Sequence, residues 1–188
     1  MSAGAAMTDF ANLPLRSDEG NLLAVIETPR GSAVKYEFEP RLHVFTVSKF
    51  LTLGLVYPFD FGFFPSTKAE DGDPLDVLII CDAGTFAGLV MEVRLIGVLA
   101  TEQTETGETI RHDRLIAVPI GYWRGQHLVN CRDLDAGLRS EIENFMRSTD
   151  ELEPKTLEFL GWKGPRTAEK LLRRAAQRYL GPESVAEN

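Results

Sequence analysis

Short runs of apolar residues, separated by turn-forming residues, occupy the first two-thirds of the chain. In residues 34–39 the alternation is strict, because charged residues fall on one face of an extended strand and Val34, Tyr36 and Phe38 on the other. Strands at this spacing predict a small β-barrel or sandwich. The runs are rich in Val, Ile, Leu and Phe, as strands are, and cover residues 22–27, 34–39, 42–50, 75–81, 89–99 and 115–120.

The last third changes to a helical period. One apolar stripe, with Asp133 as its expected N-cap, consists of Leu134, Leu138, Ile142, Phe145 and Met146. A second stripe follows Thr167 and consists of Ala168, Leu171, Leu172, Ala175, Ala176 and Tyr179. Each stripe covers one face of a helix, so we expect two amphipathic helices packed against the β part. The predicted fold class is α+β, mainly β.

Domain organisation follows from what the pattern lacks. The 188 residues contain no repeat, no low-complexity tract and no Pro/Ser-rich linker, and this length suits a single domain. Residues 1–20 are small and polar, and residues 181–188 follow a Gly-Pro stop. We therefore predict one domain over residues 21–180, with a flexible N-terminal segment and a flexible tail.

The net charge of the chain argues against two classes of binding partner. Asp and Glu number 28 against 20 Lys and Arg, a net charge of −8, which disfavours nucleic acid and anionic membrane surfaces as partners. No run approaches the roughly 18 apolar residues of a membrane helix, and the first residues do not resemble a secretory signal. We expect a cytoplasmic protein without a membrane span.

Cysteine and histidine are few and scattered. Cys81 and Cys131 lie far apart, which argues against a disulfide framework or a cysteine-rich zinc site. His43, His112 and His127 lack the i, i+4 spacing of a zinc-binding helix.

The most informative segment is the acidic turn at residues 71–76, Asp-Gly-Asp-Pro-Leu-Asp. It places three carboxylates, those of Asp71, Asp73 and Asp76, within six residues, and such oxygen clusters suit hard cations such as Mg²⁺. A solvated turn is the alternative, since Asp-Gly and Asp-Pro form turns readily. An EF-hand is excluded, because counting from Asp71 puts Leu75, Asp76 and Asp82 where that loop needs an oxygen donor, Gly and Glu.

Several further blocks surround this turn in a fixed order. They are Glu27, Lys35-Tyr36-Glu37, Tyr57-Pro58, Gly62, residues 71–77, residues 97–99, residues 115–119 and Gly161-Trp162. Together they resemble the soluble, Mg²⁺-dependent inorganic pyrophosphatases of family I, over about residues 22–162. The resemblance implies a five-stranded, OB-like β-barrel flanked by two C-terminal helices. It also implies Mg²⁺-dependent hydrolysis of pyrophosphate, with Mn²⁺ as an alternative ion, in a homo-oligomer.

The resemblance also implies a set of metal and catalytic residues. Asp71 and Asp76 would bind the Mg²⁺ that activates the attacking water, and Asp73 would be the general base and a further ligand. Asp113, from a second acidic block, would complete the metal site. Chemically this fits, because metal ions lower the pKa of bound water and neutralise phosphoryl oxygens.

Substrate-binding residues are implied in the same way. Pyrophosphate would contact Lys35, Lys49, Tyr57 and Arg114, while Glu27 and Glu37 would support the pocket.

This chain departs from the family pattern mostly at phosphate-binding positions. Lys49 stands where the family usually has Arg, and Phe61 stands where it usually has Tyr, so a guanidinium fork and a phenolic hydroxyl are lost. Thr149 and Asp150 stand in place of a Tyr-Lys pair.

The second acidic block differs as well. It lacks its first Asp, for which Glu102 or Glu105 could substitute, and Asp113 is one residue out of place beside Arg114, which replaces a Lys. A shift of one residue on a strand turns a side chain to the other face. Three functions remain open: a divergent pyrophosphatase, which the intact carboxylate cluster favours; a hydrolase of another phosphoanhydride or phosphate ester; and a non-catalytic pyrophosphatase-like protein that binds a metal, phosphate or a protein.

Overall fold

The fold is seen in a computed structural model, which describes residues 8–150 and 155–181. Residues 1–7 of the predicted N-terminal segment and 182–188 of the predicted tail lie outside the described residues. In chain order the elements are η1 (Phe10–Asn12), β1 (Leu22–Thr28), β2 (Val34–Glu39), β3 (Val44–Phe50), β4 (Asp60–Phe64), β5 (Leu75–Ile79), β6 (Val90–Glu105), β7 (Glu108–Arg111), β8 (Arg114–Pro119), η2 (Trp123–Gly125), η3 (Cys131–Asp133), α1 (Ala136–Asp150), β9 (Lys155–Lys163) and α2 (Pro165–Leu180).

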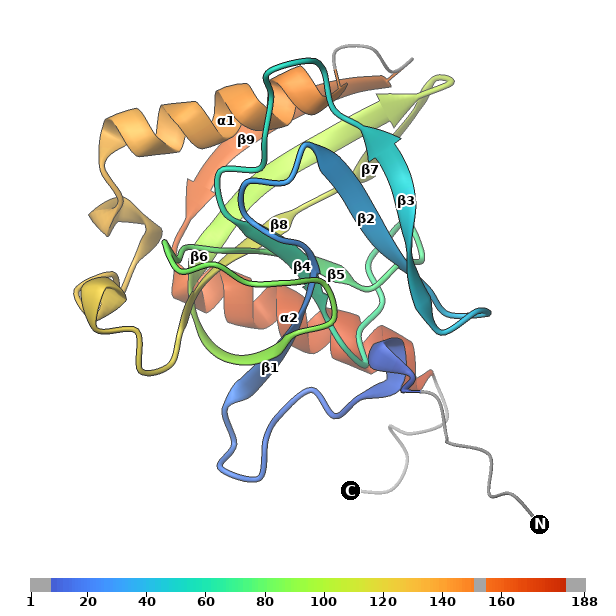
Figure 1. Cartoon of the computed structure of the whole chain (residues 1–188), viewed down its shortest axis with the longest axis vertical. Coiled ribbons are helices and arrows are strands. Elements are labelled where there is room, and N and C mark those ends of the chain that lie inside the picture. Colours follow the sequence, from blue (N-terminus) through green and yellow to red (C-terminus); the bar gives the residue numbers. More distant parts are fainter. Residues whose placement is uncertain (1–7, 151–154, 182–188) are drawn as a thin grey trace.

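Five strands close into a ring (Figure 1). Going round it, β1 pairs with β4, β4 with β5, β5 with β8, β8 with β6, and β6 again with β1. The pairing of β5 with β8 is parallel and the other four are antiparallel. The prediction of a mainly β fold, with a five-stranded barrel and two C-terminal helices, is confirmed.

The strands that build the ring are not all those that the hydrophobic pattern indicates. The predicted strands at residues 34–39 and 42–50 form a separate hairpin, β2–β3, outside the ring. Its place in the ring is taken by β4, which the pattern does not reveal because all five of its residues are buried and show no alternation. Two hydrogen bonds between Thr28 Oγ1 and the Tyr36 backbone join the hairpin to β1.

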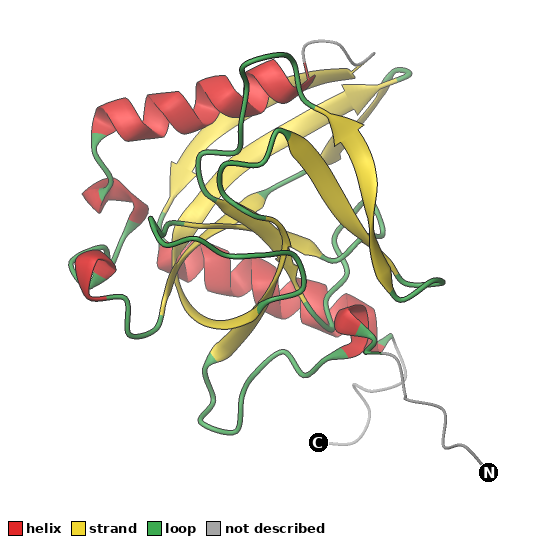
Figure 2. Ribbon diagram, viewed as in Figure 1, coloured by secondary structure: helices red, strands yellow, loops and turns green. Residues whose placement is uncertain are grey.

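The two helices cover different sides of the barrel (Figure 2). A strand that the sequence pattern does not predict, β9, runs between them and pairs with β6. The predicted capping by Asp133 is wrong for α1, because Asp133 closes a capping box on the short helix η3. Asp135 precedes α1 instead, and the Gly137 N–H donates to its Oδ1 at 2.7 Å.

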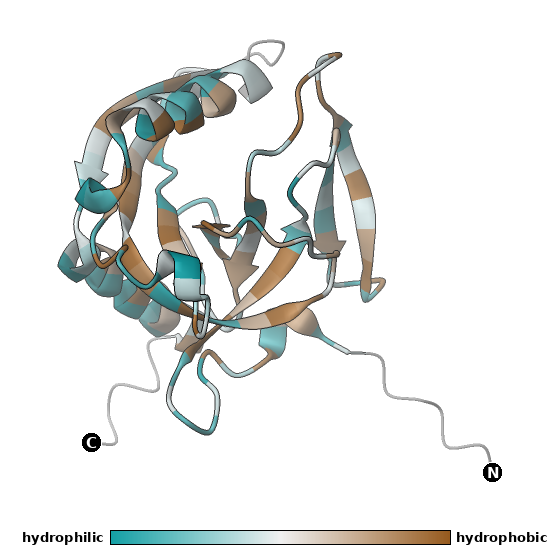
Figure 3. Ribbon diagram, turned by 60° about the vertical axis from the view of Figure 1, so that its left-hand side comes forward, coloured by the Kyte–Doolittle hydropathy of each residue, from teal (hydrophilic) through white to brown (hydrophobic). Residues whose placement is uncertain are grey.

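Both faces of the barrel strands are buried in apolar clusters. In β5, Val77 and Ile79 pack in the cluster that includes α2, whereas Leu78 belongs to the cluster that includes α1. In Figure 3 the central strands are coloured mostly white to brown, whereas the helices carry both teal and brown residues. None of the helices within the described residues has the length and apolar character needed to cross a membrane.

Candidate active site

A cavity of about 480 Å³ opens beside the acidic turn. Its wall comes from the end of β1, the hairpin β2–β3, the barrel strand β4, the start of β5 and the β6–β7 hairpin. Six of the ten predicted site residues line it: Glu27, Lys35, Glu37, Asp71, Asp73 and Asp76. The cavity is also lined by Glu105 of β6, so the fold brings together carboxylates from four separate parts of the chain with one lysine.

Local geometry holds the acidic turn in place. The Asp73 N–H donates to Asp71 Oδ1 at 3.1 Å, and between them Gly72 has a φ of +99°, which favours glycine. Asp76 lies on β5, where it pairs with Phe63 of β4. Three carboxylates are thus presented to one cavity by six consecutive residues.

The carboxylates of this turn have different environments. Burial raises the pKa of Asp73, and the neighbouring charges of Asp71 and Asp76 raise it further. For Asp76, burial acts to raise the pKa, but the hydrogen bond from His112 and the charge of Arg114 outweigh it, so the pKa is lowered. Asp73 is therefore the better proton acceptor of the two near neutral pH.

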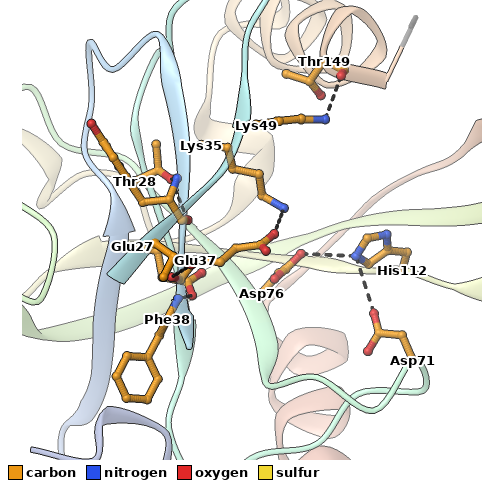
Figure 4. Close-up of polar contacts among 12 residues, drawn as sticks. Glu27, Thr28, Lys35, Glu37, Phe38, Lys49, Asp71, Asp76, His112 and Thr149 are labelled. Carbon is orange, nitrogen blue, oxygen red and sulfur yellow. Dashed lines mark hydrogen bonds and ion pairs between the residues drawn. The ribbon is translucent and has the colours of Figure 1, made fainter. Parts of the chain in front are cut away.

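Glu27 closes the cavity from the end of β1. The residue is only 8% exposed, and its Oε1 accepts a hydrogen bond of 2.8 Å from the Phe38 N–H (Figure 4). Burial is the main reason why its pKa rises to about 8, against the effect of that hydrogen bond. A nearby cation would offset this burial cost.

The raised pKa of Glu27 predicts how the free energy of unfolding depends on pH. The ordinary pKa is 4.5, so the folded chain binds more protons than the unfolded chain between about pH 4.5 and 8, and the free energy of unfolding falls as pH rises through that window. The difference, 8 − 4.5 = 3.5 units, corresponds to at most about 5 kcal/mol. Urea unfolding in EDTA should show this decline, and Glu27→Gln should flatten it, unlike the exposed Glu19→Gln. Parallel profiles for Glu27→Gln and the unsubstituted chain would contradict the assignment.

Lys35 and Glu37 form an ion pair on the same face of β2, with 2.5 Å between Nζ and Oε1 (Figure 4). They are two residues apart on a strand, so both side chains point into the cavity. Burial lowers the pKa of Lys35, but the Glu37 carboxylate more than compensates and holds the pKa above its usual range. The cavity therefore keeps one ammonium charge available to an anion.

The other four predicted site residues do not line the cavity. Lys49 is paired with Lys35 across the hairpin, and its Nζ donates to the Thr149 carbonyl at 2.8 Å. The side chain of Asp150, a further altered position, lies outside the described part of the structure. Tyr57 is 4% exposed and its ring packs edge-on against Phe145 of α1.

Asp113 and Arg114 face the interior beside β6 rather than the cavity. Asp113 Oδ1 accepts hydrogen bonds from the Thr101 N–H at 3.1 Å and from Arg111 at 2.5 Å. Arg114 Nη1 donates to Thr101 Oγ1 and to the His112 carbonyl, at 3.1 and 2.9 Å. Asp113 is thus engaged away from the other predicted metal ligands.

His112, rather than the predicted metal ligand Asp113, lines the cavity. Its Nε2 lies 3.4 Å from Asp76 Oδ2 and 3.6 Å from Asp71 Oδ2 (Figure 4). Its Nδ1 lies 2.9 Å from Gln103 Oε1. Sequence reasoning missed His112 and Gln103, although the one-residue offset of Asp113 was a signal, because neighbouring residues on an extended chain face opposite ways. Within residues 8–150 and 155–181, no group of three or more His, Cys, Asp or Glu side chains is placed so that it could hold a metal ion.

Comparison with known proteins agrees with the fold and the motifs. Residues 24–180 match the model of the inorganic pyrophosphatase family. The inorganic pyrophosphatase of Synechocystis sp. is 38% identical over 155 residues, 82% of this chain and 89% of that protein. The inorganic pyrophosphatase of Thermus thermophilus is 34% identical over 179 residues, 93% of this chain and 100% of that protein.

Solved structures show the same similarity in three dimensions. The Thermus thermophilus inorganic pyrophosphatase superposes with a TM-score of 0.85, covering 93% of this chain and 100% of that one. The Helicobacter pylori enzyme superposes with a TM-score of 0.80 at 32% identity, covering 90% of this chain and 99% of that one. The chain belongs to the inorganic pyrophosphatase family.

Proposed function

We propose that this protein hydrolyses inorganic pyrophosphate, with one water, to two phosphates. The observation that carries the proposal is the convergence of the Asp71, Asp73 and Asp76 carboxylates with Lys35 in one cavity, in a chain of this family. The acids suit divalent cations, and the lysine suits a phosphoryl oxygen.

The residues of the cavity fit Mg²⁺, the proposed cofactor. Asp71 and Asp76 would hold it, together with Asp73, since Mg²⁺ prefers carboxylate and water oxygens. The donor set supports this fit, because the Asp71, Asp73 and Asp76 carboxylates line one cavity. A cation would also offset the burial and mutual repulsion that raise the pKa of Asp73 and the burial that raises the pKa of Glu27. When bound, Mg²⁺ lowers the pKa of water and neutralises charge on phosphoryl oxygens.

The chain's own groups have separate proposed roles. Asp73 accepts the proton of the attacking water, and Lys35 contacts a phosphate oxygen while Glu37 orients its ammonium group. Glu27 supports the same network from the end of β1. Three further residues, which do not line the cavity, act on those that do. Tyr57 contributes to the raised pKa of Lys35, and Arg114 contributes to the lowered pKa of Asp76. Lys49 is the cross-strand partner of Lys35.

The decisive experiment measures phosphate release from pyrophosphate with Mg²⁺, beside nucleotides, sugar phosphates and polyphosphate. We expect pyrophosphate to be the best substrate. Faster release from another compound would support a hydrolase of a different phosphoanhydride or phosphate ester, and no release from any compound would support a non-catalytic binding protein.

Lys35 offers a narrower prediction. Replacing it by Met should raise KM for pyrophosphate by about 10- to 100-fold, because a hydrogen bond to a charged group contributes about 1.5–3 kcal/mol. Steady-state kinetics with saturating Mg²⁺ measure this effect, and the exposed Lys170→Met on α2 is the matched control. An unchanged KM would remove Lys35 from the substrate site.

The proposed setting is a homo-oligomer in the cytoplasm. Sedimentation velocity of the full chain tests the assembly, and a monomer at micromolar concentration would contradict it.

A further inference from the structure

His112 is the one imidazole among the residues that line the described cavity, and it lies between two carboxylates. Its Nε2 is 3.4 Å from Asp76 Oδ2 and 3.6 Å from Asp71 Oδ2. All three side chains are largely buried, with exposed fractions of 21–23%. The ring extends from the segment between β7 and β8 toward the acidic turn (Figure 4).

Gln103 orients the ring from β6. Its Oε1 lies 2.9 Å from His112 Nδ1, and because an amide oxygen only accepts hydrogen bonds, Nδ1 carries a proton. Nε2 is then the nitrogen directed at Asp71 and Asp76. A histidine whose second nitrogen donates to an oxygen acceptor is the usual arrangement of a metal ligand, because the outer hydrogen bond selects the tautomer and holds the ring.

The distances from His112 Nε2 to the two carboxylate oxygens are also close to those between neighbouring ligands of a small ion. Bonds of about 2.1 Å place adjacent ligands about 3.0–3.4 Å apart, in octahedral or tetrahedral geometry. The two contacts of Nε2 are at or just above this range, so small rotations of the carboxylates would complete the group.

We propose that His112 Nε2 coordinates a divalent ion together with Asp71 and Asp76, and that this nitrogen makes the site prefer Mn²⁺, Co²⁺ or Zn²⁺ to Mg²⁺. The inference deepens the proposed function and rests on it for the presence of an ion in this cavity. Imidazole is a ligand of first-row transition ions, with affinity lowest for Mn²⁺ and higher for Co²⁺ and Zn²⁺, whereas Mg²⁺ favours six oxygen ligands. Substituting nitrogen for oxygen therefore favours the transition ions selectively.

Direct detection of the nitrogen tests the proposal. The full chain is stripped with EDTA, loaded with one equivalent of Mn²⁺ and examined by pulsed EPR for ¹⁴N modulation of the Mn²⁺ signal. We expect modulation in the unsubstituted chain and in His127→Asn, a matched control at an exposed histidine, and none in His112→Asp. Absence of modulation in the unsubstituted chain would overturn the proposal without any variant having to fold.

Metal affinity provides the second measurement. Calorimetric titrations with MnCl₂ and MgCl₂ give the ratio of the two dissociation constants for each chain. The preference for Mn²⁺ should fall at least tenfold in His112→Asp and stay unchanged in His127→Asn. An equal ratio in all three chains would show that His112 is only an ion-pair partner of the acids.

The EPR and metal-affinity measurements do not depend on whether the protein hydrolyses pyrophosphate. If the ¹⁴N signal is present and pyrophosphate is not cleaved, the proposed function fails and the ligand assignment stands. If pyrophosphate is cleaved and the ¹⁴N signal is absent, the ligand assignment fails and the proposed function stands.

Discussion

Replacing Asp73 by Asn is expected to lower kcat for pyrophosphate by about 10²- to 10⁴-fold, the usual contribution of a general base. The amide keeps the size of the side chain but cannot take a proton from water. Asp73 lines the same cavity as Asp71 and Asp76, the proposed holders of Mg²⁺, so its carboxylate is placed to take a proton from a water held there. Initial rates of phosphate release with saturating Mg²⁺ and substrate measure the change.

Two further measurements show whether Asp73→Asn loses activity because the general base is gone or because the chain is unfolded. The free energy of unfolding of Asp73→Asn should equal or exceed that of the unsubstituted chain, because one of three crowded negative charges is removed. The matched control is Asp18→Asn, an exposed position before β1, which should keep full activity. A kcat for Asp73→Asn within about threefold of the unsubstituted value would assign the base to another group.

The largest effect on stability is expected from Gly62→Ala. Gly62 lies on β4 opposite Ile26 of β1, and a Cβ there would be 1.9 Å from the Val25 carbonyl oxygen and 2.9 Å from its carbon. The obstacle is backbone, so one strand of the barrel would have to move. We expect a loss of about 3 kcal/mol or more in the free energy of unfolding.

Thermal unfolding measures this loss, which corresponds to a fall of about 6–12 °C in Tm for a domain of this size. The matched control is Gly84→Ala, because a Cβ at Gly84 meets no atom within 4 Å and its φ is not positive. Activity should fall together with stability, because β1 carries Glu27 into the cavity. A Tm within 2 °C of the unsubstituted chain would mean that β1 and β4 are less closely packed than their register indicates.

Much of the site could be predicted because its parts are local in the chain. Asp71, Asp73 and Asp76 are placed together by a six-residue turn, and Lys35 and Glu37 share a face because strand side chains alternate. The structure gathers these five in one cavity, although their chemical roles stay proposals. Glu27 was found because it ends an apolar run, and it lies at the end of β1 as expected.

The second acidic block could not be predicted in the same way. Whether His112 or Asp113 points into the cavity depends on how the segment between β7 and β8 is held, and the Asp113 carboxylate is held by the Thr101 N–H of β6. That contact joins residues far enough apart that no short pattern encodes it. The same reason explains β9, which pairs with the distant strand β6, whereas β4 lacks a sequence pattern because all five of its residues are buried.

By itself, the sequence determined the α+β class, the helical stripes, the acidic turn and the family resemblance, because each depends on spacing within a few residues or on the order of short motifs. Only the tertiary structure decided which strands close the barrel, that β2 and β3 leave it as a hairpin, and that His112 rather than Asp113 joins the carboxylates. The physical reason is that strand pairing and register are set by long-range hydrogen bonds and packing, and a change of one residue in register reverses the face that each side chain occupies.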